Sequence, residues 1–407
     1  MLQRPTFVLA LALSACGGGS GQDMPDAAVG PGHDAATSVD APIPTDAPLA
    51  NTPQTQPIVM SSGGTVMAAP HIVPVFFAND ATMQATVETF LGQLAGSSYW
   101  TAISSEYGVG ALTIAPTVIA TETPPTTDTA LQTLIKAHAG GTGGWPANTP
   151  NTLYAVFLPD GVTLTMQGSA SCVAFDGYHS EVNNIIYALM PRCAATARFT
   201  TLQTTTIAAS HEFLEAATDP HPFTAPAYNT GDDEHAIWQL APGFELGDMC
   251  EYNHAAYQPL LGTFTVQRTW SNAAAAAGHD PCVPALATPY VQATTNLPFV
   301  TIDTGQGSLV TRGIQLAVGE SKTIEVDLYS DGAAPDWTVA AYDVASKYQM
   351  QPEELTFSFD KTTGHNGDKL MLTITRVKAA GQIGVSELAL QSSIDGVSAS
   401  TWWALVE

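Results

Sequence analysis

Hydrophobic positions follow a strand period and a helix period in turn along the first half of the chain. A continuous apolar run, HIVPVFFA from His71, is typical of a buried strand. Apolar residues recur at helical spacing in the next segment, which predicts an amphipathic helix: Met83, Val87, Phe90, Leu91 and Leu94. Further strands are expected in ALTIAPTVIA, NTLYAVFLPDGVTL and NNIIYALMP, and further helices in DTALQTLIKAHAG and TTTIAASHEFLEAATDP. This alternation predicts an α/β or α+β core with one mixed sheet.

After Pro284 the pattern changes to short segments in which apolar and polar residues alternate. Turn residues such as Asp331-Gly332 separate these segments, which are FVTIDTG, GIQLAVGESKTIEVDLYS, DWTVAAYDV, LTFSFDK, KLMLTITRV, VSELALQSS and STWWALVE. The regular spacing predicts an all-β, immunoglobulin-like sandwich at residues 288–407. We expect its Trp402-Trp403 pair to pack in the core rather than to form a binding platform.

The N-terminus has the pattern of an export signal. In residues 1–16 a basic residue precedes a short apolar run, and Leu13-Ser14-Ala15-Cys16 resembles the bacterial lipobox, in which the Cys is diacylated. We therefore expect Cys16 to anchor the protein to the cell envelope, at the outer membrane or the cell surface. The Asp, Ala and Pro content of residues 17–57 predicts a disordered tether. The α+β domain is expected at residues 58–287, with order beginning near Gly63.

Net charge and missing motifs exclude several classes of function. Among 407 residues, 12 Lys and Arg face 37 Asp and Glu, giving a formal net charge of -25 that repels phosphate backbones. Nucleic acid is therefore not an expected partner. The sequence contains no G-x-S-x-G, G-x-G-x-x-G or P-loop motif, so serine-hydrolase and nucleotide-binding chemistry are not expected. The expected partners are a membrane, through the lipid, and a peptide or cell-wall ligand. We expect a monomer.

Four cysteines remain when Cys16 is assigned to the lipid. An even number in an exported chain predicts disulfides, for which three pairings exist. We favour the sequence-local pairing, Cys172 with Cys193 and Cys250 with Cys282. Because no C-x-x-C is present, a cysteine-ligated zinc is not expected.

One predicted helix carries residues that could bind a metal. His211 and Glu215 lie four positions apart, hence on one helix face, and could form half of a zinc site. Glu212 holds the position of the general base in H-E-x-x-H enzymes. Here the second His is replaced by Glu215, which makes the site harder and more anionic and admits metals other than zinc. The alternative is the polar face of an ordinary helix, but the apolar run before His211 indicates burial, where such a cluster needs a partner.

A complete site needs a third protein ligand. Glu245 and Asp248 in ELGDMC lie about 30 residues downstream, next to Cys250, whose disulfide would fix them. His179 in GYHS is the competing donor. Asp219 is expected to serve the end of the helix instead. Three further histidines are weaker alternatives: His221, His235 and His254.

Several stretches resemble, in the same order, the phosphate-induced, exordium-like family of extracellular proteins from plants and bacteria. The resemblance covers residues from about 63 to 284, in GGTVMAAPHIVPVFFA, FLGQLAGSSYWTAISSEYG, GYHS, SHEFLEAATDP, ELGDMCEY and VQRTWSN. It implies a zincin-like domain with these motif positions: His211, Glu212, Glu215, the Glu245/Asp248 pair and His179. The chain departs from the family in HAIWQLAPG and in an alanine run before Cys282. Plant members are known for growth signalling, so the resemblance leaves the activity open.

Together these patterns predict a surface lipoprotein with a metal-dependent, peptidase-like hydrolase domain. In this hypothesis Zn2+ is held by His211, Glu215 and Asp248 (or Glu245), and Glu212 is the general base. A second hypothesis is a non-catalytic binding or signalling module whose metal site is structural or vestigial. A third is a cell-wall or carbohydrate binder that uses exposed aromatic residues.

Overall fold

The computed structural model describes residues 54–407 apart from 79, 306 and 382–383. The signal peptide, Cys16 and the tether up to residue 53 lie outside the described residues. Regular structure begins ahead of Gly63: β1 (Val59–Ser61) pairs with β10 (Tyr228–Gly231), and the buried Gln56 exchanges side-chain hydrogen bonds with Gln292. These partners are distant in sequence, so the local pattern could not reveal them.

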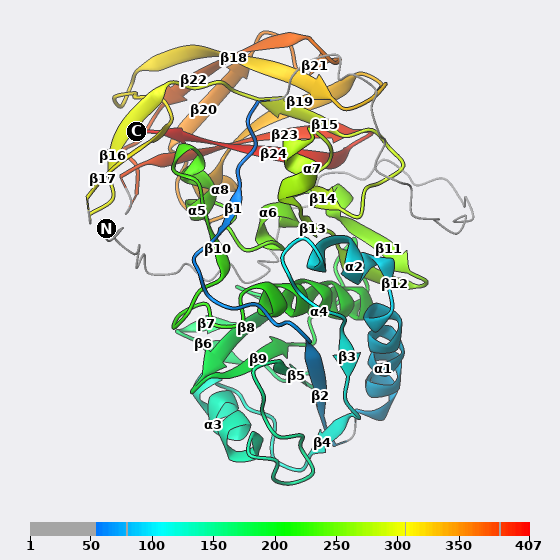
Figure 1. Ribbon diagram of the computed structural model, residues 1–407. Coiled ribbons are helices and arrows are strands. Elements are labelled where there is room, and N and C mark those ends of the chain that lie inside the picture. The colour runs from blue at the N-terminus through cyan, green and yellow to red at the C-terminus, as the bar shows by residue number, and fades with distance from the viewer. Residues whose placement is uncertain (1–53, 79, 306, 382–383) are drawn as a thin grey trace.

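A mixed sheet forms the centre of the first half of the protein (Figure 1). Its strand order is β3–β2–β5–β9–β8, and β4 also pairs with β2. The pairs β2–β3, β2–β4, β2–β5 and β5–β9 are parallel, whereas β8 is antiparallel to β9. The strands are β2 (His71–Phe77), β3 (Thr113–Ile114), β4 (Val118–Ala120), β5 (Thr152–Phe157), β8 (Tyr178–Val182) and β9 (Ile185–Met190). The predicted mixed sheet is therefore confirmed.

Helices cover both faces of this sheet. On one face, Ile72 and Phe76 of β2 belong to the same hydrophobic cluster as α1 (Ala81–Ala95), α2 (Ser98–Ser104) and α4 (Thr201–Thr218). On the other face, Val73 and Val75 pack with α3 (Asp128–His138). Alternate residues of β2 thus point to opposite faces, which explains why the whole strand is apolar. The helix α4 lies between the sheet and the second half of the protein (Figure 1).

The segment between α4 and the second half consists of short elements. The strand β12 lies along α4, since Thr206 donates its hydroxyl to the Thr265 carbonyl and Gln267 N donates to Ser210 Oγ. The elements are β6 (Thr165–Met166), β7 (Ser169–Ala170), η1 (Asp233–His235), α5 (Ile237–Leu240), α6 (Asp248–Glu251), η2 (His254–Ala256), β11 (Tyr257–Leu261), β12 (Phe264–Gln267), β13 (Thr269–Trp270), α7 (Asn272–Ala276) and β14 (Cys282–Val283).

Among its described residues, the second half contains two four-stranded antiparallel sheets and a separate two-stranded sheet. The sheets have the orders β15–β18–β22–β20 and β21–β19–β23–β24, and β16 pairs with β17. Along β22, alternate residues are buried, as the sequence pattern predicts. The immunoglobulin-like type stays a prediction. The elements are β15 (Val291–Thr294), β16 (Phe299–Asp303), β17 (Ser308–Arg312), β18 (Ser321–Ser330), β19 (Trp337–Asp343), α8 (Val344–Lys347), β20 (Leu355–Phe359), β21 (Thr363–Gly364), β22 (Lys369–Arg376), β23 (Ser386–Ile394) and β24 (Val397–Val406).

Buried aromatic side chains join the two halves. Trp238 of α5 makes edge contacts with Trp402 and Trp403 of β24, with ring centroids 5.8 and 6.5 Å apart. It also lies 5.8 Å from Trp270 of β13. All four belong to one hydrophobic cluster that extends through both halves. The tryptophan pair is therefore core, as predicted, and offers no exposed platform for a carbohydrate.

No helix among residues 54–407, as far as they are described, is long and apolar enough to cross a membrane.

A buried acid on β23 makes stability depend on pH. Burial, and then the charge of Glu354, raise the pKa of Glu387 from 4.5 to about 7. The folded state therefore holds this proton more tightly than the unfolded chain, and stability falls as the pH rises from about 4.5 to 7. Chemical denaturation at pH 4 and pH 8 should show that Glu387→Gln removes up to about 3 kcal/mol of this loss. The exposed Glu353→Gln is the control. An unchanged pH dependence in Glu387→Gln would contradict the assignment.

Candidate metal centre

The helix α4 places its polar groups inside the protein. Thr200 caps its N-terminus in a capping box with Gln203, and every residue from position 204 to 218 is buried. Positions four apart share a helix face, so His211 and Glu215 lie side by side. At the other end Asp219 is the C-cap, and its Oδ1 accepts a 2.6 Å hydrogen bond from Ala227 N. It serves the turn, as predicted.

His211, Glu215 and Asp248 form the first triad. His211 Nε2 lies 3.0 Å from Glu215 Oε2 and 3.5 Å from Asp248 Oδ1. One donor atom from each residue falls within 4.8 Å of the others, a spacing that could hold a metal ion. Their side chains are 0%, 1% and 0% exposed. Carboxylates removed from water to this degree stay ionised only beside a compensating positive charge.

Hydrogen bonds fix which nitrogen of His211 faces this triad. Gln267 Nε2 donates to the Gly247 carbonyl at 2.7 Å, so Gln267 Oε1 is the acceptor for His211 Nδ1 at 3.1 Å. With its proton on Nδ1, the neutral imidazole turns the Nε2 lone pair toward two carboxylates. That contact is repulsive unless a cation, either a second proton or a metal ion, lies between them. Donation of the remote N–H to a fixed acceptor is also typical of metal-ligating histidines.

Backbone donors orient Glu215. Its Oε1 accepts hydrogen bonds from Gly247 N at 2.9 Å and from Asp248 N at 3.2 Å. This leaves Oε2 directed at His211. Gly247 lies so close to α4 that a Cβ at this position would lie 2.6 Å from His211 Nδ1 and 2.7 Å from Glu215 Oε1. Only glycine fits between the helix and the segment that carries Asp248.

His179, Glu215 and Glu245 form a second triad beside the first. His179, on the edge strand β8, has Nδ1 3.8 Å from Glu215 Oε2 and Nε2 3.8 Å from Glu245 Oε1. Burial acts to lower the pKa of His179, but Glu245, Glu212 and Glu215 outweigh it and raise the pKa to about 10. Burial, opposed by His179, raises the pKa of Glu245. The two predicted candidates for the third ligand, Asp248 and Glu245, thus fall into different triads.

Glu212 lies on the His179 side of α4. Its Oε2 is 3.5 Å from His179 Nδ1, and its Oε1 is buried with no hydrogen-bond partner among the described residues. Gly177 packs against it, since a Cβ there would lie 3.0 Å from Glu212 Oε1.

The three weaker histidine candidates lie outside both triads. His221 pairs with Glu181, and His235 pairs with Asp232. Burial, Arg198 and Lys347 lower the pKa of His254 to about 4.

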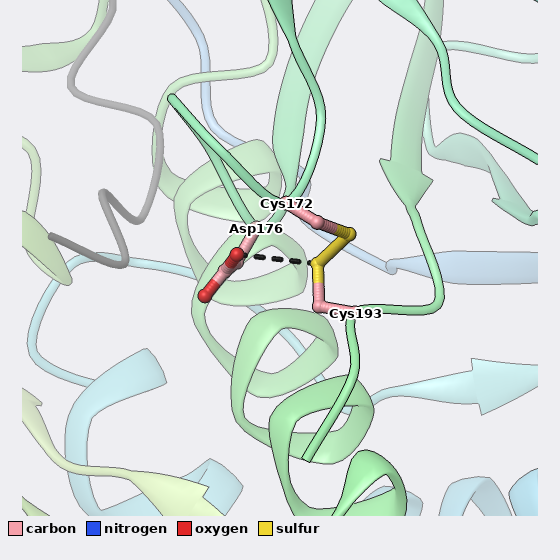
Figure 2. A group of neighbouring side chains, drawn as sticks. All are labelled: Cys172, Asp176 and Cys193. Carbon is pink, nitrogen blue, oxygen red and sulfur yellow. Dashed lines mark hydrogen bonds between the residues drawn. A yellow bond between two sulfur atoms is a disulfide. The ribbon is translucent and has the colours of Figure 1, made fainter. Parts of the chain in front are cut away.

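The structure contains both disulfides of the favoured pairing. Cys172–Cys193 fixes the segment that leads into Gly177 and His179 (Figure 2). Asp176 lies beside it, with Oδ1 3.2 Å from Cys193 Sγ, and burial raises the pKa of Asp176 to about 6. Although these three groups are close enough to surround an ion, both sulfurs are consumed by the disulfide. This group is therefore structural.

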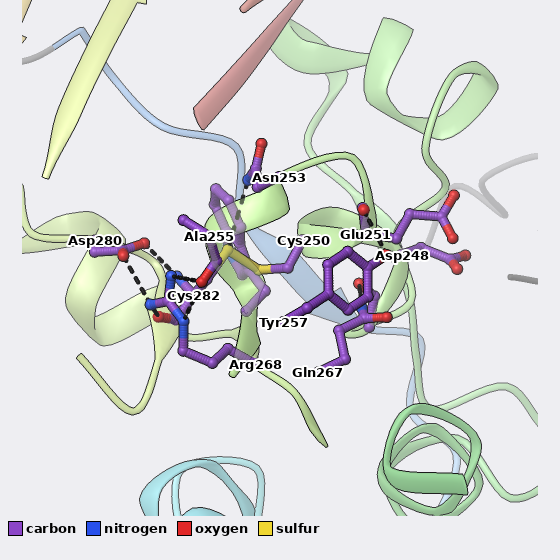
Figure 3. Close-up of a disulfide and its surroundings, with 12 residues drawn as sticks. Asp248, Cys250, Glu251, Asn253, Ala255, Tyr257, Gln267, Arg268, Asp280 and Cys282 are labelled. Carbon is purple, nitrogen blue, oxygen red and sulfur yellow. Dashed lines mark hydrogen bonds and ion pairs between the residues drawn. A yellow bond between two sulfur atoms is a disulfide. The ribbon is translucent and has the colours of Figure 1, made fainter. Parts of the chain in front are cut away.

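The second disulfide, Cys250–Cys282, fixes the segment that carries Asp248 (Figure 3). The fully buried Arg268 supports it by donating to Asp280 Oδ2 at 2.7 Å, to the Ala255 carbonyl at 3.0 Å and to the Cys282 carbonyl. The neighbouring Gln267 contacts His211. Sequence reasoning missed the roles of Gly247, Gln267 and Arg268, although all three lie in the ELGD and VQRTWSN stretches.

No protein-family model matches the chain. No curated protein matches it either. Among solved structures, a conjugative transposon lipoprotein from Bacteroides eggerthii matches 30% of this chain and 99% of its own, at 11% identity and a TM-score of 0.19. A likeness at this TM-score carries no argument about the fold or the function of the present chain.

The close approach of Gly247 yields a test of the geometry. Gly247→Ala should lower the free energy of unfolding by about 1–3 kcal/mol, because the new methyl group overlaps the side chains of His211 and Glu215. Urea denaturation measures the change. Gly92→Ala, at an exposed position within α1 where a Cβ meets nothing within 4 Å, should instead stabilise by about 0.5–1 kcal/mol. A neutral Gly247→Ala would show that the segment does not press on the helix.

Proposed function

We propose that the protein is an exported, envelope-associated hydrolase, peptidase-like and metal-dependent, with its ion held by His211, Glu215 and Asp248. The observation that carries this proposal is the buried Nε2 lone pair of His211 directed at two carboxylates. One imidazole and two carboxylates suit Zn2+, and the two hard oxygen donors also admit Mn2+. The two disulfides are typical of an exported protein.

The zincin-like fold and the exordium-like family belong to the same proposal. The sheet is mixed, and its antiparallel edge strand β8 supplies His179 next to the buried helix α4. Three of the family-like stretches, SHEFLEAATDP, ELGDMCEY and VQRTWSN, meet at the site through His211, Asp248 and Gln267. The convergence of segments so far apart in sequence on one cluster supports the proposal.

Each residue then has a defined part in hydrolysis. When bound, the metal ion supplies Lewis-acid polarisation of the scissile carbonyl. Glu212 takes the proton of the attacking water at its Oε1, which is buried and has no hydrogen-bond partner among the described residues. Gln267 holds His211 in the tautomer that presents Nε2. Glu245, with a side chain 20% exposed, is the most accessible acid of the site, so solvent and substrate approach from its side.

A non-catalytic module with a structural metal is the second candidate. The observation in its favour is the near-complete burial of His211, Glu215 and Asp248, because structural metal sites are closed whereas catalytic sites keep an open position. Binding through Trp402 and Trp403 is not supported, because both side chains are buried. A cell-wall or carbohydrate binder that uses other, exposed aromatic residues stays a prediction.

Metal content and hydrolysis together distinguish these functions. We expect at least one divalent metal per chain by mass spectrometry after aerobic purification without chelator, and its loss in His211→Ala. Glu212→Gln should keep the metal but lower hydrolysis of a peptide library about 10²–10⁴-fold. Glu88→Gln, on the exposed side of α1, is the matched control.

Metal far below one equivalent would refute the site. Undiminished hydrolysis in Glu212→Gln would refute the assigned base. Bound metal without any hydrolysis in the wild type would favour the structural module.

Lipid anchoring is tested separately, since Cys16 lies outside the described residues. Cys16→Ser should move the protein from the membrane fraction to the soluble fraction, measured by fractionation and immunoblotting, because the acyl chains are attached through this thiol. Ser20→Ala should leave it in the membrane fraction. Retention of the Cys16→Ser protein on the membrane would contradict the lipobox assignment.

A further inference from the structure

Glu215 belongs to both triads. Its Oε2 lies 3.0 Å from His211 Nε2 and 3.8 Å from His179 Nδ1. The two triads are separate groups within the described structure, since each collects its own donors within 4.8 Å and Glu215 is their shared member. Its other oxygen, Oε1, is held by two backbone N–H groups. Glu215 is therefore fixed with one oxygen between two imidazoles, as a bridging ligand would be.

The second imidazole is oriented in the same way as the first. His179 Nε2 lies 3.3 Å from the Asp219 carbonyl, which can only accept a hydrogen bond. In the neutral form that could bind a metal ion, the ring proton is therefore on Nε2, which also lies 3.8 Å from Glu245 Oε1, and Nδ1 turns its lone pair toward Glu215 and Glu212. Both histidines thus donate their remote N–H to a fixed acceptor and direct the other nitrogen at carboxylates.

The number of carboxylates favours two ions over one. Four of them surround the two imidazoles: Glu212, Glu215, Glu245 and Asp248. As metal ligands all four would be ionised, and their combined formal charge would be twice that of one divalent cation. The buried Glu212 Oε1, which has no hydrogen-bond partner among the described residues, lies on the side of the second triad. A second cation in the second triad would neutralise the charge of Glu212. A single ion in the first triad would leave that charge uncompensated.

We propose that the site is a dinuclear centre in which Glu215 bridges two divalent cations, one held by His211 and Asp248 and the other by His179 and Glu245. The proposal deepens the proposed function and rests on it. Pairs of metal ions about 3.5–4 Å apart stabilise both the attacking and the leaving oxygen in hydrolysis. Two such ions would favour a substrate with two anionic or carbonyl oxygens close together, such as a peptide carbonyl beside a free carboxylate.

Stoichiometry and spin coupling test the proposal. The full-length exported protein is stripped with chelator, reloaded with Mn2+ and studied by equilibrium dialysis and electron paramagnetic resonance. We expect about two Mn2+ per chain and an exchange-coupled spectrum, because one carboxylate bridges the ions. His179→Gln should bind about one Mn2+ and give the six-line spectrum of an isolated ion. Asp248→Asn, which removes a ligand of the other ion, should also bind about one Mn2+ and give the six-line spectrum. His221→Gln, whose partner Glu181 is outside both triads, should keep two.

The outcomes separate the two proposals. Saturation of the wild type at one Mn2+ overturns the dinuclear centre but leaves a mononuclear hydrolase intact. Two ions without coupling, or two ions retained in His179→Gln, also overturn it. No Mn2+ or Zn2+ binding at all refutes the proposed function itself. The thermal unfolding temperature of each variant is compared with that of the wild type. Equal temperatures show that a variant has lost an ion because it lost a ligand and not because it unfolded.

Discussion

The burial of the Glu215 carboxylate is the constraint on which the rest of the site depends. It lies on a helix whose whole length from position 204 is enclosed, so water cannot solvate its charge. Two backbone N–H groups, from Gly247 and Asp248, stabilise one oxygen, and imidazoles face the other. Such a charge is tolerated only when partners converge with little positional freedom. The glycine, the disulfides and the packed helix all serve that convergence.

Covalent and polar supports hold the loops that supply those partners. The segment with Asp248 has only four helical residues and could not hold its position alone, so Cys250–Cys282 and the buried Arg268 fix it from behind (Figure 3). The segment before His179 is fixed in the same way by Cys172–Cys193. On the far side, Trp238 ties the loop before ELGD to the β-rich half. The second half therefore contributes to the rigidity of the site although no residue of it belongs to either triad.

Local pattern was sufficient for the longer strands and helices of the first half and for half of the site. The strand at His71 and the helices at Ala81 and Asp128 follow from periodicity, and His211 and Glu215 follow from a spacing of four on a helix. The partners of that half-site are set by tertiary contacts, which periodicity does not encode. Gln267 lies between Val266 and Arg268 and belongs to no metal-binding motif, yet it fixes the tautomer of His211. The sequence predicts His179 as an alternative ligand for one ion. Its position on the edge strand β8 places it in a separate triad instead.

The presence of Glu at position 215, where H-E-x-x-H enzymes have their second His, follows from this geometry. A neutral imidazole offers one lone pair in one direction, and its other nitrogen must donate a proton. An imidazole at position 215 could face His211 or His179. It could not face both while also accepting hydrogen bonds from two backbone N–H groups. A carboxylate has two oxygens with about four acceptor directions between them. One oxygen can be fixed by Gly247 and Asp248 while the other lies between the two histidines. A carboxylate at position 215 therefore fits the proposed shared ligand position better than an imidazole would.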